Sequence, residues 1–316
     1  MAGVARYSGY TSYDSAGSPK FTPTIWSKKM LRNFYQLTVF SEIANTDYTG
    51  EIKGQGDSVI IRTIPAITIN SYTVGGTLTY EVPTKANKSL NIDQAKSWSF
   101  RIDDIDAMQS DLDLMNKFAA DAGERLKIAI DQDCLSYAVG KADSHNRGAT
   151  AGVVTSGINM GAAGGTNGSN AVSITSDNAT DFVVDINNVL DEANIPSEDR
   201  WCIVPAWYCA RLKKGDLKSA EISGDTTGLI RSGVIGMIDR TKVISSNNLY
   251  TATEGTAKLF YLLAGTKEAM TFALQLTKTE TLQIPDSFGN YMRGLSVYGR
   301  EVIQPTCLVE GVCIAG

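Results

Sequence analysis

The chain has 316 residues, of which 43% are hydrophobic, and a net charge of −5, so it is long enough to bury one large core or two modest ones. Its lysines and arginines are scattered, which argues against a sequence-specific nucleic-acid binder, because such proteins carry a basic stripe. No run approaches the ~18 apolar residues of a membrane span, and the N-terminal sequence MAGVARYSGY lacks the apolar core of a secretory signal.

The first 50 residues begin with a tail rich in Tyr, Ser and Gly, which we expect to be loose unless a neighbour orders it. A short helix is predicted over residues 25–41, with Thr24 at its N-cap position. Four apolar residues fall on one side of this helix: Trp26, Met30, Leu37 and Phe40.

An extended arm is predicted over residues 58–101. Residues 89–104 alternate between apolar and polar side chains, as in a strand with one wet face, and residues 57–65 supply a β-branched partner strand. The hairpin between them is poor in large apolar residues; Leu78, Tyr80 and Val82 alternate until Pro83 stops the ladder. Such a hairpin is marginal alone in water, so it needs a neighbouring surface; the alternative is a β-meander folded back on its own domain.

A long amphipathic helix is predicted over residues 107–140, with a capping box formed by Asp106 and Gln109, and Gly140 at its end. The aspartates around its start suit the positive end of the helix dipole; a calcium loop is the alternative, but it lacks the turn glycine and the distal glutamate. The predicted apolar stripe consists of Met108, Leu112, Met115, Ala119, Ala122, Leu126, Ala129 and either Asp133 or Cys134, widened by Phe118, Ile130 and Tyr137.

The remaining chain predicts an α+β domain. Residues 141–176 are rich in Gly, Ala, Ser and Asn and predict a loop or a flexible hairpin. A helix is predicted over residues 180–193, and a short helix is predicted for AWYCARLKK (residues 206–214). A buried strand is predicted for WCIVP (201–205), and two further strands are predicted for TKVISSNN (241–248) and KLFYLLAG (258–265).

The sequence contains few patterns that are typical of catalytic, cofactor-binding or metal-binding sites. The single histidine, His145, lies in the glycine-rich loop, where a lone histidine is usually solvated, and no nucleophile elbow or phosphate loop occurs. We therefore expect no enzyme and no catalytic, cofactor-binding or metal-binding residue. The cysteines show no C-x-x-C pair and sit in apolar contexts, which favours buried free thiols over a disulfide: Cys134, Cys202, Cys209, Cys307 and Cys313.

Several segments together resemble the tailed-bacteriophage major capsid proteins of the HK97 fold, in particular relatives of the P22 coat protein without a large inserted domain. GEIKGQGDSVIIRTIP resembles the base of the E-loop, FRIDDIDAMQSDLDL the entry to the spine helix, and LKIAIDQDCL the end of that helix. RWCIVPAWYCARL and RSGVIGMIDRTKVISSNNL resemble the A-domain, and IPDSFGNYMRGLSVYGREVIQPTCLV the P-domain hairpin with its return strand.

The resemblance implies four parts. These are an N-terminal arm over residues 1–50, an extended E-loop hairpin over 51–103, a P-domain over 104–140 and 270–300, and a mixed α/β A-domain over 141–269 and 301–316. The P-domain would contain the long spine helix and a β-hairpin.

The resemblance also implies a function. Subunits would assemble as hexamers and pentamers into an icosahedral virion shell that encloses double-stranded DNA without reading its sequence, after synthesis in the host bacterial cytoplasm. Expected partners are a separate scaffolding protein, a portal protein and, in some shells, a decoration protein; no membrane is involved. The alternatives are an encapsulin-type nanocompartment shell, whose proteins usually begin with a cargo-binding helix instead of a Tyr/Ser/Gly tail, and a β-rich surface adhesin.

Some shells of this fold join an E-loop lysine to a P-domain asparagine of a neighbour. Lys85 and Lys88 lie on the expected arm, and Asn290 lies on the expected P-domain loop. The same residues are also ordinary at turns and strand edges, and the relatives that this chain most resembles do not crosslink.

Overall fold

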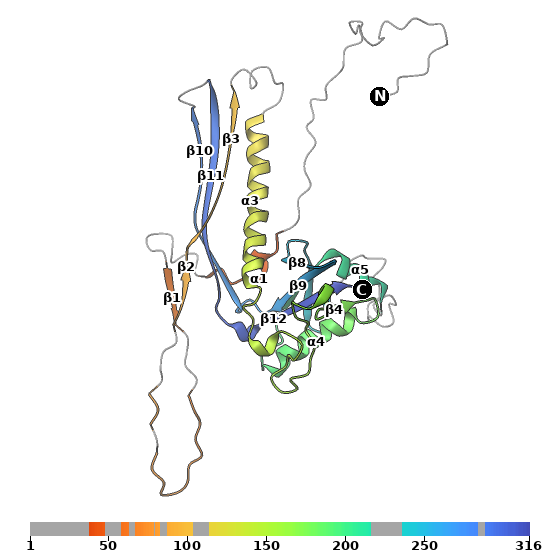
Figure 1. Cartoon of the computed structure of the whole chain (residues 1–316). Coiled ribbons are helices and arrows are strands. Elements are labelled where there is room, and N and C mark those ends of the chain that lie inside the picture. Colours follow the sequence, from red (N-terminus) through yellow and green to blue (C-terminus); the bar gives the residue numbers. More distant parts are fainter. Residues whose placement is uncertain are drawn as a thin grey trace, which may run out of the picture.

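The computed structural model describes residues 38–47, 58–62, 67–78, 80–82, 87–103, 114–215, 236–283 and 288–316. A long helix lies along a tall three-stranded sheet, and a compact α+β unit adjoins one end of both (Figure 1). A two-stranded ribbon leads away from this junction into an extended arm (Figure 1).

The long helix, α3 (Leu114–Ala138), has 25 residues and is therefore about 38 Å long at a rise of ~1.5 Å per residue. Gly140 follows it with a φ of +75°, the left-handed conformation that ends many helices, as the sequence predicted. The predicted start of the helix, with the capping box at Asp106 and the neighbouring aspartates, lies outside the described residues.

The three-stranded antiparallel sheet has the order β10-β11-β3. Its strands are β3 (Gln94–Asp103), β10 (Met270–Gln283) and β11 (Gly289–Val302). The predicted alternation along β3 is confirmed, since its even-numbered residues are the more buried ones. Trp98 lies over Gly294 on β11, where an added Cβ would come within 2.5 Å of the indole ring, so this position needs glycine.

The ribbon pairs β1 (Ser58–Arg62) with β2 (Asn87–Asn91) in antiparallel register. The predicted upstream partner strand is thus confirmed. The prediction of one continuous strand over residues 89–104 is wrong. Ile92 and Asp93 separate β2 from β3, and the two strands belong to different sheets. Leu90 and Ile61 anchor the ribbon in a small apolar cluster with Ile303.

The compact unit contains a seven-stranded sheet with the order β4-β12-β9-β5-β7-β6, in which β8 also pairs with β9. Its strands are β4 (Val172–Ile174), β5 (Arg200–Val204), β6 (Met237–Ile238), β7 (Thr241–Ser245), β8 (Thr251–Glu254), β9 (Ala257–Gly265) and β12 (Leu308–Ala315). The helices α4 (Ala179–Glu192) and α5 (Ala206–Lys214), and the strands β5, β7 and β9, confirm the predictions for these segments.

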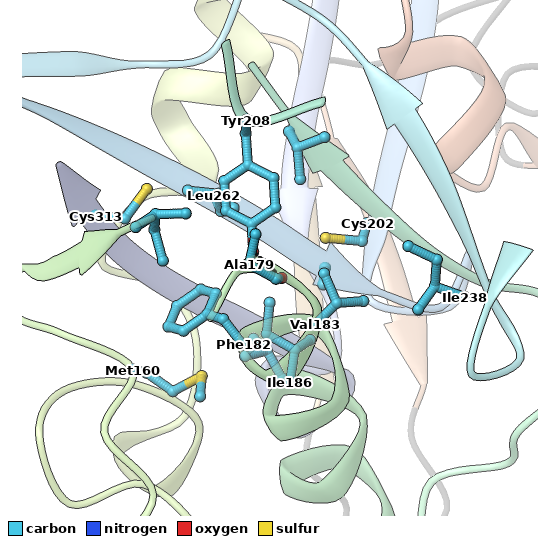
Figure 2. Packing of buried hydrophobic residues seen from close by; sticks show 14 of the residues in the cluster. Met160, Ala179, Phe182, Val183, Ile186, Cys202, Tyr208, Ile238, Leu262 and Cys313 are labelled. Carbon is cyan, nitrogen blue, oxygen red and sulfur yellow. Dashed lines mark hydrogen bonds between the residues drawn. The ribbon is translucent and has the colours of Figure 1, made fainter. Parts of the chain in front are cut away.

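The main core lies between this sheet and α4 (Figure 2). Phe182, Val183 and Ile186 of α4 point toward Leu262 and Cys202 of the sheet, and Tyr208 of α5 closes the cluster (Figure 2). The apolar spacing of four along α4 is therefore explained by burial of one helix face.

A second core joins the compact unit to α3 and to the tall sheet. Leu135 and Cys134 of α3 pack with Trp201 and Leu263 of the seven-stranded sheet and with Tyr298 of β11. All five cysteines are buried and unpaired, as the sequence predicted. The junction is thus a continuous apolar contact and not a flexible linker.

Two other segments differ from the expectations in detail. The helix α1 spans only Phe40–Ile43, and residues 38 and 39 before it are not helical; the earlier part of the predicted helix lies outside the described residues. The glycine-rich segment after α3 is a connection as predicted, with short 3-10 turns at Ser144–Asn146 and Thr166–Gly168, but it also contributes β4 to the sheet. A third 3-10 turn, Pro305–Cys307, precedes β12.

Candidate assembly surfaces

The arm between β1 and β2 exposes large apolar side chains. Val74 is 94% exposed, Ile69 91% and Tyr80 89%. A turn closes at the tip, where the amide of Gly76 donates to the carbonyl of Thr73. Ile67, Tyr72, Leu78 and Val82 are exposed on the same arm. The described part of the subunit leaves these side chains exposed, and an apolar surface of this kind is typical of a contact with another molecule.

Two of the three residues considered for a covalent crosslink, Lys88 and Asn290, lie in strands. Lys88 belongs to β2 at the base of the arm, and its Nζ donates to the carbonyl of Val302 at 3.2 Å. Asn290 lies in β11, in register with Ile102 and Gln283, and not in a loop as expected. Lys85 lies outside the described residues.

An open groove of about 570 Å³ runs between α3 and the tall sheet. One face of α3 forms one wall, with Ala119, Gly123, Leu126 and Ile130. The opposite wall contains Trp98, Phe272, Leu274, Thr277, Thr279 and Ser296, and Thr38, Phe40 and Ser41 close one end. Leu126, predicted to face the core, is therefore only half-buried and lines this groove.

Asp131 of α3 is buried and holds the start of α1. Its Oδ1 accepts hydrogen bonds from the backbone amides of Val39 and Phe40, each at 2.8 Å. Its Oδ2 accepts from Nδ2 of Asn248 at 2.7 Å. The sequence carried a signal for this role that we did not use: an aspartate sits between Ile130 and Cys134 on the buried side of a helix.

A second polar cluster ties α3 to β11. Asp133 forms an ion pair with Arg300 and accepts a 2.6 Å hydrogen bond from the hydroxyl of Tyr298. The Arg300 guanidinium lies 4.8 Å from the centre of the Tyr137 ring, and Tyr137 donates to Glu301 at 2.8 Å. Burial, together with the Glu301 carboxylate, raises the pKa of Tyr137 to about 12.

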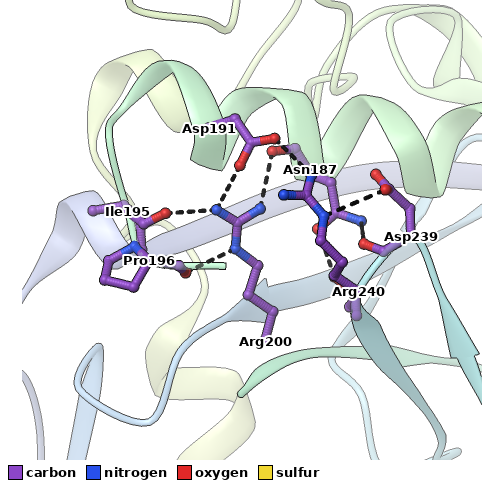
Figure 3. A network of polar contacts seen from close by, with 8 residues as sticks. Asn187, Asp191, Ile195, Pro196, Arg200, Asp239 and Arg240 are labelled. Atoms are coloured by element: carbon purple, nitrogen blue, oxygen red, sulfur yellow. Dashed lines mark hydrogen bonds and ion pairs between the residues drawn. The ribbon is translucent and has the colours of Figure 1, made fainter. Parts of the chain in front are cut away.

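A third network stiffens the compact unit (Figure 3). The fully buried guanidinium of Arg200 donates to Asp191 at 2.7 Å and to the carbonyls of Ile195 and Pro196. Arg240 binds the other oxygen of Asp191 at 2.9 Å. Desolvation opposes ionisation of Asp191, but the hydrogen bonds from both arginines outweigh it, so its pKa is lowered. Both oxygens of the Asp191 carboxylate accept hydrogen bonds within the subunit, so this side chain stabilises the fold.

The described residues contain no group of three or more His, Cys, Asp or Glu side chains placed to hold a metal ion. His145 is more than half exposed and its Nδ1 lies 3.0 Å from Asp143. Burial raises the pKa of the Cys134 and Cys313 thiols, which makes them poor nucleophiles.

In the described part of the chain, no helix is both long enough and apolar enough to span a membrane. The prominent surfaces are therefore the arm and the groove.

Comparison with known proteins decides the family. A family model for phage capsid proteins matches residues 94–310, which is more than half of the chain. The chain belongs to this phage capsid protein family. A search among curated proteins finds no match.

Solved structures agree with this assignment. A chain from Mycobacterium phage Che8 is 27% identical, with a TM-score of 0.75 over 93% of this chain and 97% of that chain. A capsid chain of the cyanophage P-SCSP1u is 17% identical, with a TM-score of 0.64 over 94% and 93% of the two chains. A capsid chain of Ralstonia phage GP4 is 13% identical, with a TM-score of 0.64 over 97% and 99%.

This phage capsid protein therefore has an HK97-like α+β fold, and its role is that of a major capsid protein located in the virion capsid. The resemblance drawn from the sequence is confirmed. Neither the nanocompartment shell nor the surface adhesin is favoured.

Proposed function

We propose that this major capsid protein assembles as hexamers and pentamers into an icosahedral shell around double-stranded DNA, and that its arm supplies a principal contact between subunits. The observation that carries this proposal is the row of apolar side chains along residues 67–82, which the described part of the same subunit leaves exposed. Their burial against a neighbour would stabilise the shell by removing apolar surface from water.

The proposed parts of the subunit follow the expected division. Residues 1–50 are the N-terminal arm, 51–103 the E-loop, 104–140 with 270–300 the P-domain, and 141–269 with 301–316 the A-domain. Two features support the last boundary: β11 ends at Val302, and β12 returns the chain to the seven-stranded sheet.

The proposed role is structural and not enzymatic, with no catalytic, cofactor or metal site. The carboxylates with lowered pKa values support this view, since Asp191 and Glu280 are held in ion pairs with arginines instead of facing a pocket. The proposal includes no crosslink through Lys88, whose amine is bonded within its own subunit.

The proposed partners are a separate scaffolding protein that sets the size of the shell, a portal protein and, on some shells, a decoration protein; assembly would occur in the host bacterial cytoplasm. The net charge of −5 without a basic stripe supports enclosure of DNA rather than sequence-specific binding. Expression of the chain alone should give particles of mixed size, and uniform shells under those conditions would contradict the need for a scaffolding partner.

The test of the arm is a deletion of residues 67–85. The shortened chain should remain folded, because none of the described residues in this segment belongs to the buried clusters, but it should not form closed shells in electron micrographs. A matched control replaces the same residues with a Gly/Ser linker of equal length, which keeps the connection and removes the apolar side chains. Normal shells from both variants would rule out the proposed contact.

A further inference from the structure

The groove between α3 and the tall sheet is open and largely apolar. Its α3 wall carries small residues, Ala119 and Gly123, one turn apart. An added Cβ at Gly123 would meet no atom within 4 Å. The groove is therefore open above Gly123, and glycine leaves more room at this position than any other residue would. Small residues of this kind let a second chain segment approach a helix closely.

The groove is also where the N-terminal segment enters the described structure. Thr38, the first described residue, lines one end of the groove. The carboxylate of Asp131 binds the amides of Val39 and Phe40, which fixes the chain at that end of the groove. The sequence that precedes Thr38 therefore joins the described structure at that end of the groove.

The sequence just before Thr38 matches the groove in length and character. From Ala119 to Asp131 the groove wall extends about 18 Å along α3, at ~1.5 Å per residue. Residues 25–37, read IWSKKMLRNFYQL, would extend a similar distance as a helix. Trp26, Met30 and Leu37 repeat at helical spacing, and the walls offered by Trp98, Leu126 and Phe272 are apolar.

We propose that residues 25–37 bind in this groove of the same subunit, with their apolar side facing Gly123 and Trp98. The N-terminal arm would then be attached along α3 before it leaves toward other molecules. The inference concerns a single chain, so it does not depend on how subunits assemble. A neighbour's arm or a second copy's N-terminal segment are the competing occupants.

A fluorescence measurement distinguishes these occupants. The full-length variant Gly123→Cys is labelled with bimane, whose emission tryptophan quenches on contact; the five native thiols are buried and should not react. Emission should increase when Trp26→Phe is added. Trp98, which also lines the groove, quenches bimane in the labelled proteins with and without Trp26→Phe, so it does not contribute to the difference between them. Bimane on Arg125→Cys, an exposed position on the other side of the helix, should not respond to Trp26→Phe.

Two results would overturn the proposal. Equal emission with and without Trp26 would mean that the segment is not in the groove. Quenching of the labelled Gly123→Cys/Trp26→Phe protein on mixing with unlabelled wild-type chain would mean that a second copy occupies it.

Limited proteolysis gives an independent readout if labelling perturbs the fold. Lys28, Lys29 and Arg32 are trypsin sites within the segment, and binding in the groove should protect them. Gly123→Leu fills the groove and should accelerate cleavage at these sites, whereas Ala120→Leu places the same side chain at an exposed position of α3 and should not. Equal cleavage rates in the two variants would contradict the proposal.

Discussion

Oδ2 of Asp131 on α3 accepts a 2.7 Å hydrogen bond from Nδ2 of Asn248, in the loop that follows β7 of the compact unit. Because Oδ1 of the same carboxylate binds the start of α1, three parts of the chain meet at one side chain: the N-terminal segment, the long helix and the seven-stranded sheet unit. Asp131 is only 2% exposed, so these hydrogen bonds compensate for the water that its carboxylate loses on burial.

Replacement of Asp131 by alanine should destabilise the subunit by about 3 kcal/mol or more. The change leaves two backbone amides and the Asn248 amide without their acceptor, and hydrogen bonds to a charged group contribute roughly 1.5–3 kcal/mol each. Chemical denaturation checks this value. Glu124→Ala removes an exposed carboxylate from the same helix and should change stability by less than about 1 kcal/mol. Similar losses in the two variants would contradict the assigned role of Asp131.

Position along α3 should determine how much a leucine contributes. Leu135 is fully buried, so Leu135→Ala should cost roughly 2–5 kcal/mol through the cavity that it creates. Leu126 lines the groove in which we place residues 25–37, so Leu126→Ala should cost less in a chain that lacks residues 1–37 than in the full-length chain. Thermal unfolding of both leucine variants, each with and without residues 1–37, gives the comparison. A cost at Leu126 that does not depend on residues 1–37 would mean that this segment does not cover it.

A charge on the arm should prevent assembly without affecting the folded subunit. Tyr80 is 89% exposed, so Tyr80→Asp should leave the unfolding temperature of the subunit unchanged, while sedimentation should show far fewer shells because the charge would be buried against a neighbour. Thr77→Asp introduces the same charge at a polar position of the arm and serves as the control. Shell yields that fall equally would indicate a general effect of charge rather than loss of an apolar contact.

Glu310 should make the subunit less stable as pH rises. Burial raises its pKa above the ordinary value of 4.5, although the amide of Gly140 and the charge of Arg147 counteract part of the effect. The folded state then holds a proton that the unfolded state has released, so stability falls from about pH 4.5 up to the raised pKa. Glu310→Gln should therefore raise the unfolding temperature at pH 7 and have little effect below pH 4.5.

Glu280→Gln provides the control of opposite sign. Hydrogen bonds from Lys278 and Arg293 lower the pKa of Glu280, so its contribution is present above the ordinary pKa and is lost on acidification. This variant should not be stabilised at pH 7. A difference in unfolding temperature between wild type and Glu310→Gln that does not change with pH would contradict the assignment to Glu310.

The sequence by itself determined the elements whose pattern depends on near neighbours in the chain. The spacing of four in α4, the alternation along β3 and the glycine after α3 are local signals, because each follows from which face of one element is buried. The exposed arm was also predictable, since a two-stranded hairpin alone buries too little apolar surface to form a core of its own.

The tertiary structure alone decided which residues meet across the chain. Asp131 and Val39 are 92 positions apart, and Lys88 binds a carbonyl 214 positions away, so no local pattern specifies these contacts. The break between β2 and β3 has the same origin: the alternation continues through it, but the two strands pair with different partners, β1 and β11. Hydrophobic periodicity indicates which face of a strand is buried, but it does not indicate which distant strand becomes its partner.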